Sequence, residues 1–406
     1  MIADKLMIEK LAEQYDSFYL YDEEKILEGM QTLQSHFPLV SFLYSLKCNS
    51  NPHVLECVFA NGFGADAASA GEVMLARENG VDKGRVFYSA PGKTVKDIEK
   101  TVNSSVIIAD SIDEIRRIQS IAEKMKITAD IGIRVNPGFS FCSKNGLPSK
   151  FGIDEEQALA FLRRNECANV RIKGIHVHLR SQELNAQVLS DYYDNILLLT
   201  ERMQKAVPEP FEWINMGSGM GIPYSVNEKP LAVEELGKHV NVSLVNFKKD
   251  FPDVRIYIET GRYVVGKAGL YVTKVIDRKL SRGKTFIILK NTMNGFVRPS
   301  LARLVAQYST EVSPPGSEPF FTGTDAFQFI ALKEGRSDES VTLAGNLCTA
   351  TDVIAENIRM PHLEYGDLVA VTNAGAYAAV LSPMQFSSQE RPAELFVTKE
   401  GNVLYS

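Results

Sequence analysis

Residues 23–260 alternate short apolar runs with amphipathic stretches, and this alternation restricts the fold more than any other feature of the chain. Runs such as SFLYSL (41–46), SVIIAD and VRIYIET are typical of buried strands, whereas AGEVMLARENG and SIDEIRRIQSIAEKM have helical spacing. Roughly eight strand–helix units follow one another, which favours a parallel sheet. That many units over this length suit a closed barrel, so we expect a (β/α)8 TIM barrel at 23–260.

The pattern changes after residue 260. Segments such as KTFIILKN, ESVTLAG and DLVAVTN are rich in strand-forming residues, are separated by polar turns and show little helical periodicity. A chain of 406 residues also exceeds the usual size of one domain, roughly 250–300 residues. We therefore expect a second, mainly β domain made of 261–406 together with 1–22, because FYLYD (18–22) resembles its strands. STEVSPPGSEP (309–319) is expected to form a loop.

Composition excludes several classes of protein. The net charge of −6 argues against a nucleic-acid-binding surface, which would need a basic patch. No stretch approaches about 18 uninterrupted apolar residues, so we expect no membrane span. The N-terminal stretch mixes acids with bases and lacks an apolar signal core, which predicts a cytoplasmic protein.

Disulfide and metal chemistry find little support in the spacing of cysteines and histidines. The five cysteines are odd in number and widely scattered, and no pair has CxxC spacing. His176 and His178 would point to the same face of a strand, which leaves a metal site open as an alternative. No carboxylate or thiolate candidate lies near them in the sequence, so we expect no metal.

Polar residues follow most of the expected barrel strands at the point where each strand ends. In a barrel these ends meet at one mouth, where the chemistry takes place. A lysine, a histidine, an acid, an arginine and a glycine-rich turn are therefore expected to converge. The residues concerned are Lys47, Asp66, Ser69, Ser89, Asn136, His178, Gly217, Ser218, Gly219, Glu259 and Arg262.

Three of these positions suggest a particular chemistry, each with an ordinary alternative. Lys47 follows an apolar strand, and burial would favour the neutral amine that a Schiff base needs, although most lysines lie at the surface. The glycines of Asn215–Gly221 would let backbone N–H groups close on a phosphate, or would simply form a tight turn. Glu259 could keep a pyridine nitrogen protonated, or form a surface ion pair with Arg262.

A series of motifs, in the same order along the chain, resembles those of the alanine-racemase-fold decarboxylases. That family includes diaminopimelate, ornithine and arginine decarboxylases, and the resemblance runs from Phe18 to Phe396. The motifs are Tyr44–Asn49, Gly64–Glu72, His176–Gln182, Gly217–Gly219, Glu259–Arg262, Gly345–Asp352 and Gly375–Tyr377.

The resemblance implies an enzyme that uses pyridoxal 5'-phosphate. Lys47 would form a Schiff base with the cofactor, His178 would stack on its ring, and Glu259 would pair with its pyridine nitrogen. Cys348 would reach into the active site of a partner subunit and donate a proton after carbon dioxide leaves, which requires a homodimer with shared active sites. The other implied cofactor-binding residues are Asp66, Ser181, Gly217, Ser218, Gly219, Gly261, Arg262 and Tyr377. The implied substrate-binding residues are Arg262, Arg298 and Thr349.

Several positions depart from the family pattern and bear on the substrate. Thr349 follows Cys348 where the diamine-forming relatives carry an acid for the distal ammonium group, and a hydroxyl cannot replace that charge-assisted bond. Ala302 stands where diaminopimelate decarboxylases have a tyrosine. Arg180 replaces a glycine and adds a cation at the mouth, and Ser382–Phe386 departs from an asparagine-rich segment.

At these positions the chain resembles the branch of the family that acts on conjugated amino acids in antibiotic or siderophore biosynthesis. That branch includes glutamyl-acyl-carrier-protein and citryl-amino-acid decarboxylases. The substrate would then be a small amino acid or a conjugate, including one linked to a carrier protein. Diaminopimelate decarboxylase of lysine biosynthesis is an alternative, because Arg298 is retained. An amino-acid racemase on the same barrel would need a tyrosine base from the second domain. A non-catalytic relative would typically lack the lysine or the cysteine, and Lys47 and Cys348 are both present.

Overall fold

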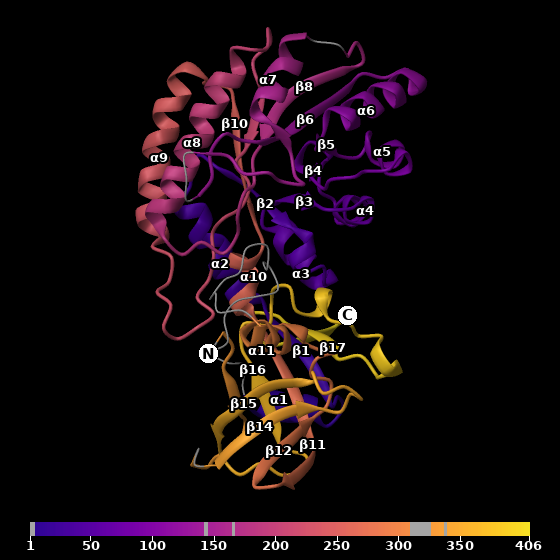
Figure 1. The fold of residues 1–406 in the computed structure, drawn as a ribbon, viewed down its shortest axis with the longest axis vertical. Coiled ribbons are helices and arrows are strands. Elements are labelled where there is room, and N and C mark those ends of the chain that lie inside the picture. Colours follow the sequence, from indigo (N-terminus) through magenta and orange to yellow (C-terminus); the bar gives the residue numbers. More distant parts are fainter. Residues whose placement is uncertain (1–4, 142–144, 165–166, 309–325, 337–338) are drawn as a thin grey trace.

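The computed structural model describes residues 5–141, 145–164, 167–308, 326–336 and 339–406. They form two parts that follow each other along the long axis of the molecule, a barrel and a second body built on another sheet (Figure 1). The expected loop 309–319 lies outside the described residues.

Eight parallel strands close into the barrel, which confirms the expected (β/α)8 architecture. Around the ring the order is β2, β3, β4, β5, β6, β8, β9 and β10, and β10 pairs with β2 to close it. The short β7 (Ile153–Asp154) pairs with β6 outside the ring. The ring strands are β2 (Ser41–Ser45), β3 (Gly64–Ala67), β4 (Val86–Tyr88), β5 (Val106–Ala109), β6 (Ala129–Asn136), β8 (Val170–His176), β9 (Trp213–Asn215) and β10 (Arg255–Thr260).

Helices connect successive strands on the outside of the barrel (Figure 1). Several begin at a polar residue whose side chain accepts a hydrogen bond from a backbone N–H of the first turn, as Asp22, Ser69 and Ser111 do. The helices are α2 (Glu23–His36), α3 (Pro52–Ala60), α4 (Ala70–Glu78), α5 (Val95–Thr101), α6 (Ile112–Met125), α7 (Glu155–Arg164), α8 (Ala186–Gln204) and α9 (Val233–Asp250).

The inside of the barrel is a packed core. Trp213 faces Gly132 and Gly174, where a Cβ atom would overlap its indole ring, so only glycine leaves room for this tryptophan. Because side chains fill the interior, the chemistry is left to the carboxyl ends of the strands. The buried residues of this cluster are Leu43, Phe87, Ile108, Trp213 and Tyr257.

The second sheet has the strand order β15, β14, β12, β11, β1, β17 and β18, and β16 pairs with both β11 and β13. The N-terminal strand β1 lies between β11, to which it is antiparallel, and β17, to which it is parallel. The two ends of the chain therefore share one sheet. Its strands are β1 (Ser17–Asp22), β11 (Gly269–Ser281), β12 (Lys284–Leu289), β13 (Phe329–Ala331), β14 (Glu339–Gly345), β15 (Val353–Met360), β16 (Leu368–Val371), β17 (Ala393–Val397) and β18 (Val403–Tyr405).

The expectation of little helical structure after residue 260 was wrong for α11 (Val297–Tyr308). Pro299 lies in its first turn, where the missing N–H is not needed, so the proline does not interrupt the helix. Arg298 and Ala302 are four residues apart in α11 and thus share a face. Two shorter helices, α1 (Lys5–Ala12) and α10 (Arg262–Val265), lie at the start of the chain and just after the barrel.

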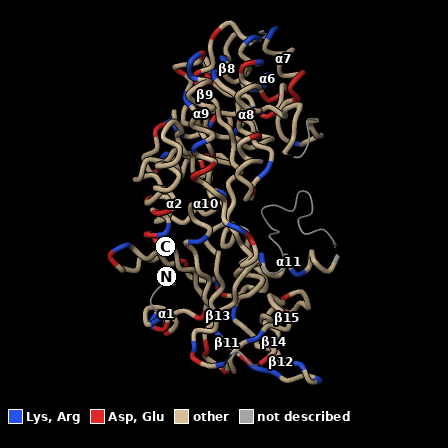
Figure 2. Tube along the Cα trace, turned by 90° about the vertical axis from the view of Figure 1, so that its left-hand side faces the viewer, with Lys and Arg blue, Asp and Glu red and all other residues tan. Residues whose placement is uncertain are grey.

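Acidic and basic residues are interspersed along both parts of the molecule (Figure 2). In the part of the chain that the structure describes, no helix combines the length and apolarity needed to cross a membrane.

Candidate active site

Lys47 lies just beyond β2, in a single 3-10 turn (Leu46–Cys48), and points to a buried carboxylate. Its Nζ is 2.8 Å from Oδ2 of Asp66, which belongs to the neighbouring strand β3. Two hydroxyl groups also donate to this carboxylate, Ser45 Oγ at 2.7 Å and Ser89 Oγ at 2.6 Å. Asp66 is fully buried, so these donors and the lysine supply the bonds that water would otherwise make.

The expectation that burial keeps the Lys47 amine neutral was wrong. Burial opposes the charge, but the carboxylates of Asp66 and Glu259 and the nearby Tyr377 outweigh it, so the pKa of Lys47 is raised. The side chain is also 42% exposed, because it projects into an open space at the barrel mouth. Lys47 is therefore a protonated amine that both a carboxylate and a ligand from solvent can reach.

A second buried carboxylate, Glu259, lies at the end of β10. His176 Nε2 is 3.1 Å from its Oε1, and the Asn215 amide donates to the same oxygen at 2.9 Å. Burial alone would raise the pKa of Glu259, but His176, with smaller contributions from Lys47 and His178, holds it well below its usual range. Glu259 is thus an ionised group held rigidly in the protein interior.

His178 follows β8 and lies between two segments of the barrel mouth. Its Nδ1 accepts a hydrogen bond from the Ser218 backbone N–H at 3.0 Å, so the proton of the neutral ring is on Nε2, 3.5 Å from Ser181 Oγ. Burial lowers the pKa of His178 to about 3, and the positive charges of Arg134 and Lys47 act in the same direction against Glu259. Arg134 also donates to the His178 carbonyl at 2.9 Å, which fixes the backbone below the ring.

The glycine-rich turn after β9 is shaped by Gly217. Its φ is +68°, and a Cβ atom there would overlap the Val177 carbonyl, so the position requires glycine. Asn215 Oδ1 accepts the Gly217 N–H at 3.0 Å, and the Gly217 carbonyl accepts the Glu259 N–H at 2.8 Å. The turn is thereby joined to the strand end that carries Glu259.

Two buried guanidinium groups, those of Arg262 and Arg298, meet at one hydroxyl. Tyr224 OH accepts from Arg262 Nη1 at 3.1 Å and from Arg298 Nη1 at 3.0 Å. Arg298 also donates to the Ala376 carbonyl at 3.0 Å. The Cζ atom of Arg262 lies 4.9 Å from the centre of the Tyr377 ring. Two fixed cations so close together favour an anionic ligand.

The Cys348 turn, residues 346–352, belongs to the second sheet and joins β14 to β15. The Cys348 thiol is exposed, which excludes the role of a buried structural cysteine. The Thr349 hydroxyl lies 2.9 Å from that of Thr351 and accepts the Thr351 N–H at 3.3 Å, while backbone hydrogen bonds and the Asp352 carboxylate hold the rest of the turn. The turn thus stands on two strands of the second sheet, whereas Lys47, Asp66 and Glu259 stand on strand ends of the barrel.

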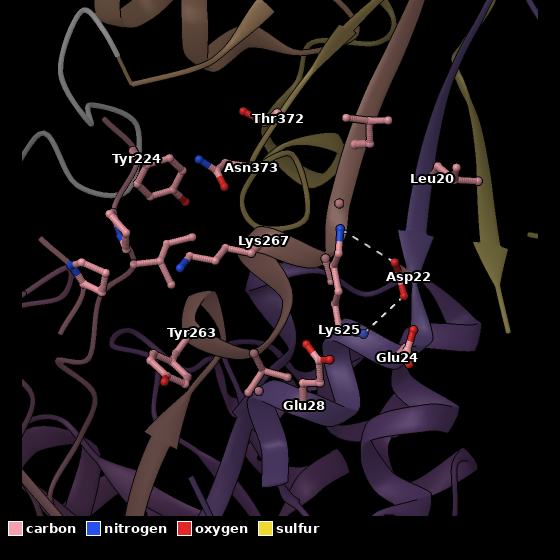
Figure 3. Close-up of a pocket in the computed structure, with 18 of the residues that line it drawn as sticks. Leu20, Asp22, Glu24, Lys25, Glu28, Tyr224, Tyr263, Lys267, Thr372 and Asn373 are labelled. Carbon is pink, nitrogen blue, oxygen red and sulfur yellow. Dashed lines mark hydrogen bonds and ion pairs between the residues drawn. The ribbon is translucent and has the colours of Figure 1, made fainter. Parts of the chain in front are cut away.

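A groove of about 1000 Å³ runs beside this cluster, between the barrel and the second sheet (Figure 3). Tyr224, Lys267 and Asn373 lie on one side of it, while Lys25 and Glu28 of α2 lie on the other. Lys47 is not among the lining residues, so the groove is distinct from the space above the lysine. Tyr224 lines the groove, and its hydroxyl also binds the two arginines.

Comparison with known proteins identifies the family. Residues 23–266 match the family model described as pyridoxal-dependent decarboxylase, pyridoxal binding domain. The chain belongs to this family. These decarboxylases are carboxy-lyases that use pyridoxal phosphate, which favours the decarboxylase over the racemase and non-catalytic alternatives.

The pyridoxal-dependent decarboxylases to which the chain is similar carry names with different substrates. One is the L-glutamyl-[BtrI acyl-carrier protein] decarboxylase of Niallia circulans, 33% identical over 97% of this chain and 92% of the relative. The diaminopimelate decarboxylase of Aquifex aeolicus is 28% identical over 98% of this chain and 90% of the relative. The solved structure of Helicobacter pylori diaminopimelate decarboxylase with L-lysine has a TM-score of 0.82 at 26% identity, and the match covers 98% of this chain and 95% of that one.

The geometry fits the cofactor of these decarboxylases. A lysine amine, an ionised buried carboxylate, a neutral imidazole and a turn that only glycine can form lie at one barrel mouth. The structure also brings in residues for which the sequence suggested no such role: Asn215, Arg134, Tyr224 and, as the partner of Glu259, His176. The sequence could have indicated Arg134, which is the one basic residue in the apolar run ADIGIRVNP. A strand of this kind is buried on both faces, and a buried charged residue nearly always has a partner.

Proposed function

We propose that this pyridoxal-dependent decarboxylase acts on a conjugated amino acid, one whose distal end is joined to a larger group. Thr349 carries the proposal, because the residue after the proton-donating cysteine is neutral and its hydroxyl already lies 2.9 Å from Thr351. A free diamino acid would leave its distal ammonium group without a carboxylate at this position. The relative that acts on carrier-linked glutamate supports the same class of substrate.

Residues of the barrel mouth would hold the cofactor and keep it in one orientation. We assign covalent attachment to Lys47, with Asp66 beside it to accept the proton that the amine must lose. His178 would pack on the ring as a neutral group that does not compete for protons. Glu259 would hold the pyridine nitrogen protonated, and the bound cofactor then supplies an electron sink for the bond to the carboxylate.

The phosphate would lie at the turn of Gly217, Ser218 and Gly219. Backbone N–H groups of a glycine turn can approach an anion closely. The further phosphate-binding residues in this proposal are Ser181, Gly261, Arg262 and Tyr377.

The proton that replaces carbon dioxide would come from Cys348 of the partner subunit. The thiol is exposed on the second sheet, apart from the Lys47 cluster, so a homodimer in which this sheet covers the other barrel mouth would bring them together. A thiol held close to the carbon that has lost carbon dioxide would donate its proton there and become a thiolate.

Arg298 would bind the distal part of the substrate, and the small side chain of Ala302 would make room for it. Both are buried on one face of α11, and alanine is smaller than the tyrosine that diaminopimelate decarboxylases have at this position. The groove beyond Tyr224 offers further room next to the two arginines. These features support a substrate longer than a free diamino acid.

A substrate panel tests the assignment. We expect carbon dioxide release from glutamate linked to an acyl carrier protein, or from a citryl-amino-acid conjugate, with kcat/KM at least about 100-fold above that for free ornithine, lysine or meso-diaminopimelate, since one missing charge-assisted contact is worth that much. Free glutamate and free carrier protein serve as controls. Equal turnover of a free diamino acid would contradict the conjugate proposal.

Diaminopimelate decarboxylation is the second candidate. Arg298 provides a cation for a distal carboxylate, and the Aquifex aeolicus and Helicobacter pylori relatives carry that name. The same panel separates the two candidates, because this one requires rapid turnover of free meso-diaminopimelate.

Cys348→Ala is expected to lower kcat by about 100-fold or more, the usual contribution of a positioned proton donor. Cofactor binding, measured by visible absorbance, should stay unchanged because Cys348 is not one of the residues proposed to hold the cofactor. Cys167→Ala is the matched control, since Cys167 is a partly exposed thiol in the barrel. Full activity of the Cys348 variant would refute the donor role.

A further inference from the structure

One buried carboxylate, that of Asp352, holds the backbone on which Cys348 is mounted. Asp352 is 2% exposed and lies four residues after the cysteine. Its Oδ2 accepts the backbone N–H of Leu347 at 2.9 Å, and Leu347 directly precedes Cys348. The carboxylate therefore fixes the backbone of Leu347, and the position of Leu347 determines the direction of the Cys348 side chain.

The other carboxylate oxygen reaches a separate segment of the chain. Oδ1 of Asp352 accepts the backbone N–H of Met293 at 2.9 Å and the hydroxyl of Thr292. The Thr292 carbonyl accepts the Phe296 N–H at 2.6 Å, and α11 begins at the next residue with Arg298 in its first turn. A single side chain thus connects the thiol turn to the helix that carries Arg298.

The packing around this carboxylate leaves little freedom. A Cβ atom at Gly345 would overlap both the Thr292 hydroxyl and the Asp352 carboxylate. Within the turn, the Thr349 N–H donates to the Leu347 carbonyl at 2.8 Å, and the Asp352 N–H donates to the Thr349 carbonyl at 3.3 Å. The thiol remains exposed on top of a turn whose base is fixed.

The chemistry of the three bonds favours a carboxylate over an amide. All three donors are neutral, and an ionised carboxylate can accept every one of them because both of its oxygens are acceptors. Asparagine has one acceptor oxygen and an NH2 group, so it would place a donor against a donor on one side.

We propose that Asp352 is a positioning residue that sets the Cys348 thiol for proton donation and keeps it in register with Arg298. The inference deepens the proposed function, on which it rests. The turn and α11 share this anchor, but Arg298 is also held by Tyr224 and the Ala376 carbonyl, so loss of the anchor should act mainly on the thiol.

Asp352→Asn tests the proposal in the intact holoenzyme. We expect kcat to fall about tenfold while KM changes less than about twofold, on the scale of one lost hydrogen bond to a charged group. The rate at which iodoacetamide alkylates Cys348, followed by peptide mapping, should change at least about threefold because the turn is released. Thr292→Val should lower kcat and change the alkylation rate in the same direction but by less. Thr292→Ser keeps the hydroxyl and should give the kcat and the alkylation rate of the parent enzyme.

Asp367→Asn is the matched control for loss of a carboxylate in the second sheet. Asp367 accepts hydrogen bonds from Lys333 Nζ at 2.6 Å and from the Glu364 N–H at 2.7 Å, away from the Cys348 turn. It should lower the melting temperature without altering kcat or the alkylation rate. If Asp352→Asn behaves in the same way while Cys348→Ala is slow, the positioning role is wrong. If Cys348→Ala keeps its full rate, the donor role fails instead.

Discussion

Replacing Lys47 with alanine is expected to abolish the visible absorbance of the bound cofactor and to lower decarboxylation by on the order of a thousandfold or more. The lysine amine lies 2.8 Å from Asp66 and within electrostatic range of Glu259 at the barrel mouth. Without it the cofactor can bind only through non-covalent contacts. The spectrum of the purified variant and its carbon dioxide release measure the two effects.

Lys47→Arg is the control that separates covalent attachment from charge. The guanidinium keeps a cation beside Asp66, but it does not lose its proton and is not a nucleophile. We expect the arginine variant to lose the spectrum and the activity as fully as alanine does, while its melting temperature without cofactor stays closer to that of the parent. Retention of the cofactor spectrum by either variant would rule out Lys47 as the attachment site.

The barrel was predictable because each of its units carries a local signal. Apolar runs such as 41–46 end in polar residues, and the stretches between the runs have helical spacing. The spacing of apolar residues is therefore enough to predict the eight strands and their helices. The helix α11 was missed because Pro299 near its start reads as an interruption when only the local sequence is considered. Its position in the first turn is a property of the three-dimensional context.

That these residues lie at one barrel mouth was predictable, but their protonation was not. Lys47, His178 and Glu259 stand at strand ends, and a barrel brings such ends together. The raised pKa of Lys47 depends on carboxylates from β3 and β10, and no local pattern in the sequence predicts those distances. Tyr224, whose hydroxyl joins two arginines from distant segments, likewise becomes visible only once the chain is folded.

Glu259→Gln is expected to lower kcat by about 100-fold or more, the scale for removing one preorganised electrostatic group. Glu259 is ionised and fully enclosed, with His176 and Asn215 at one oxygen, so it keeps its charge throughout the working pH range. Glutamine preserves the shape but cannot hold a pyridine nitrogen protonated. Cofactor attachment through Lys47 should persist, so the visible spectrum should remain while its maximum shifts and turnover falls.

Glu114→Gln provides the comparison for loss of a buried acid in the same barrel. Glu114 Oε1 lies 2.7 Å from Lys93 Nζ, and both side chains are almost fully buried, so breaking this pair should cost stability. We expect it to lower the melting temperature at least as much as Glu259→Gln does, with kcat of the folded enzyme within about threefold of the parent, since a buried ion pair away from the reacting atoms contributes to stability alone. Equal losses of kcat in the two variants would mean that Glu259 acts through stability, and the electron-sink role would then be wrong.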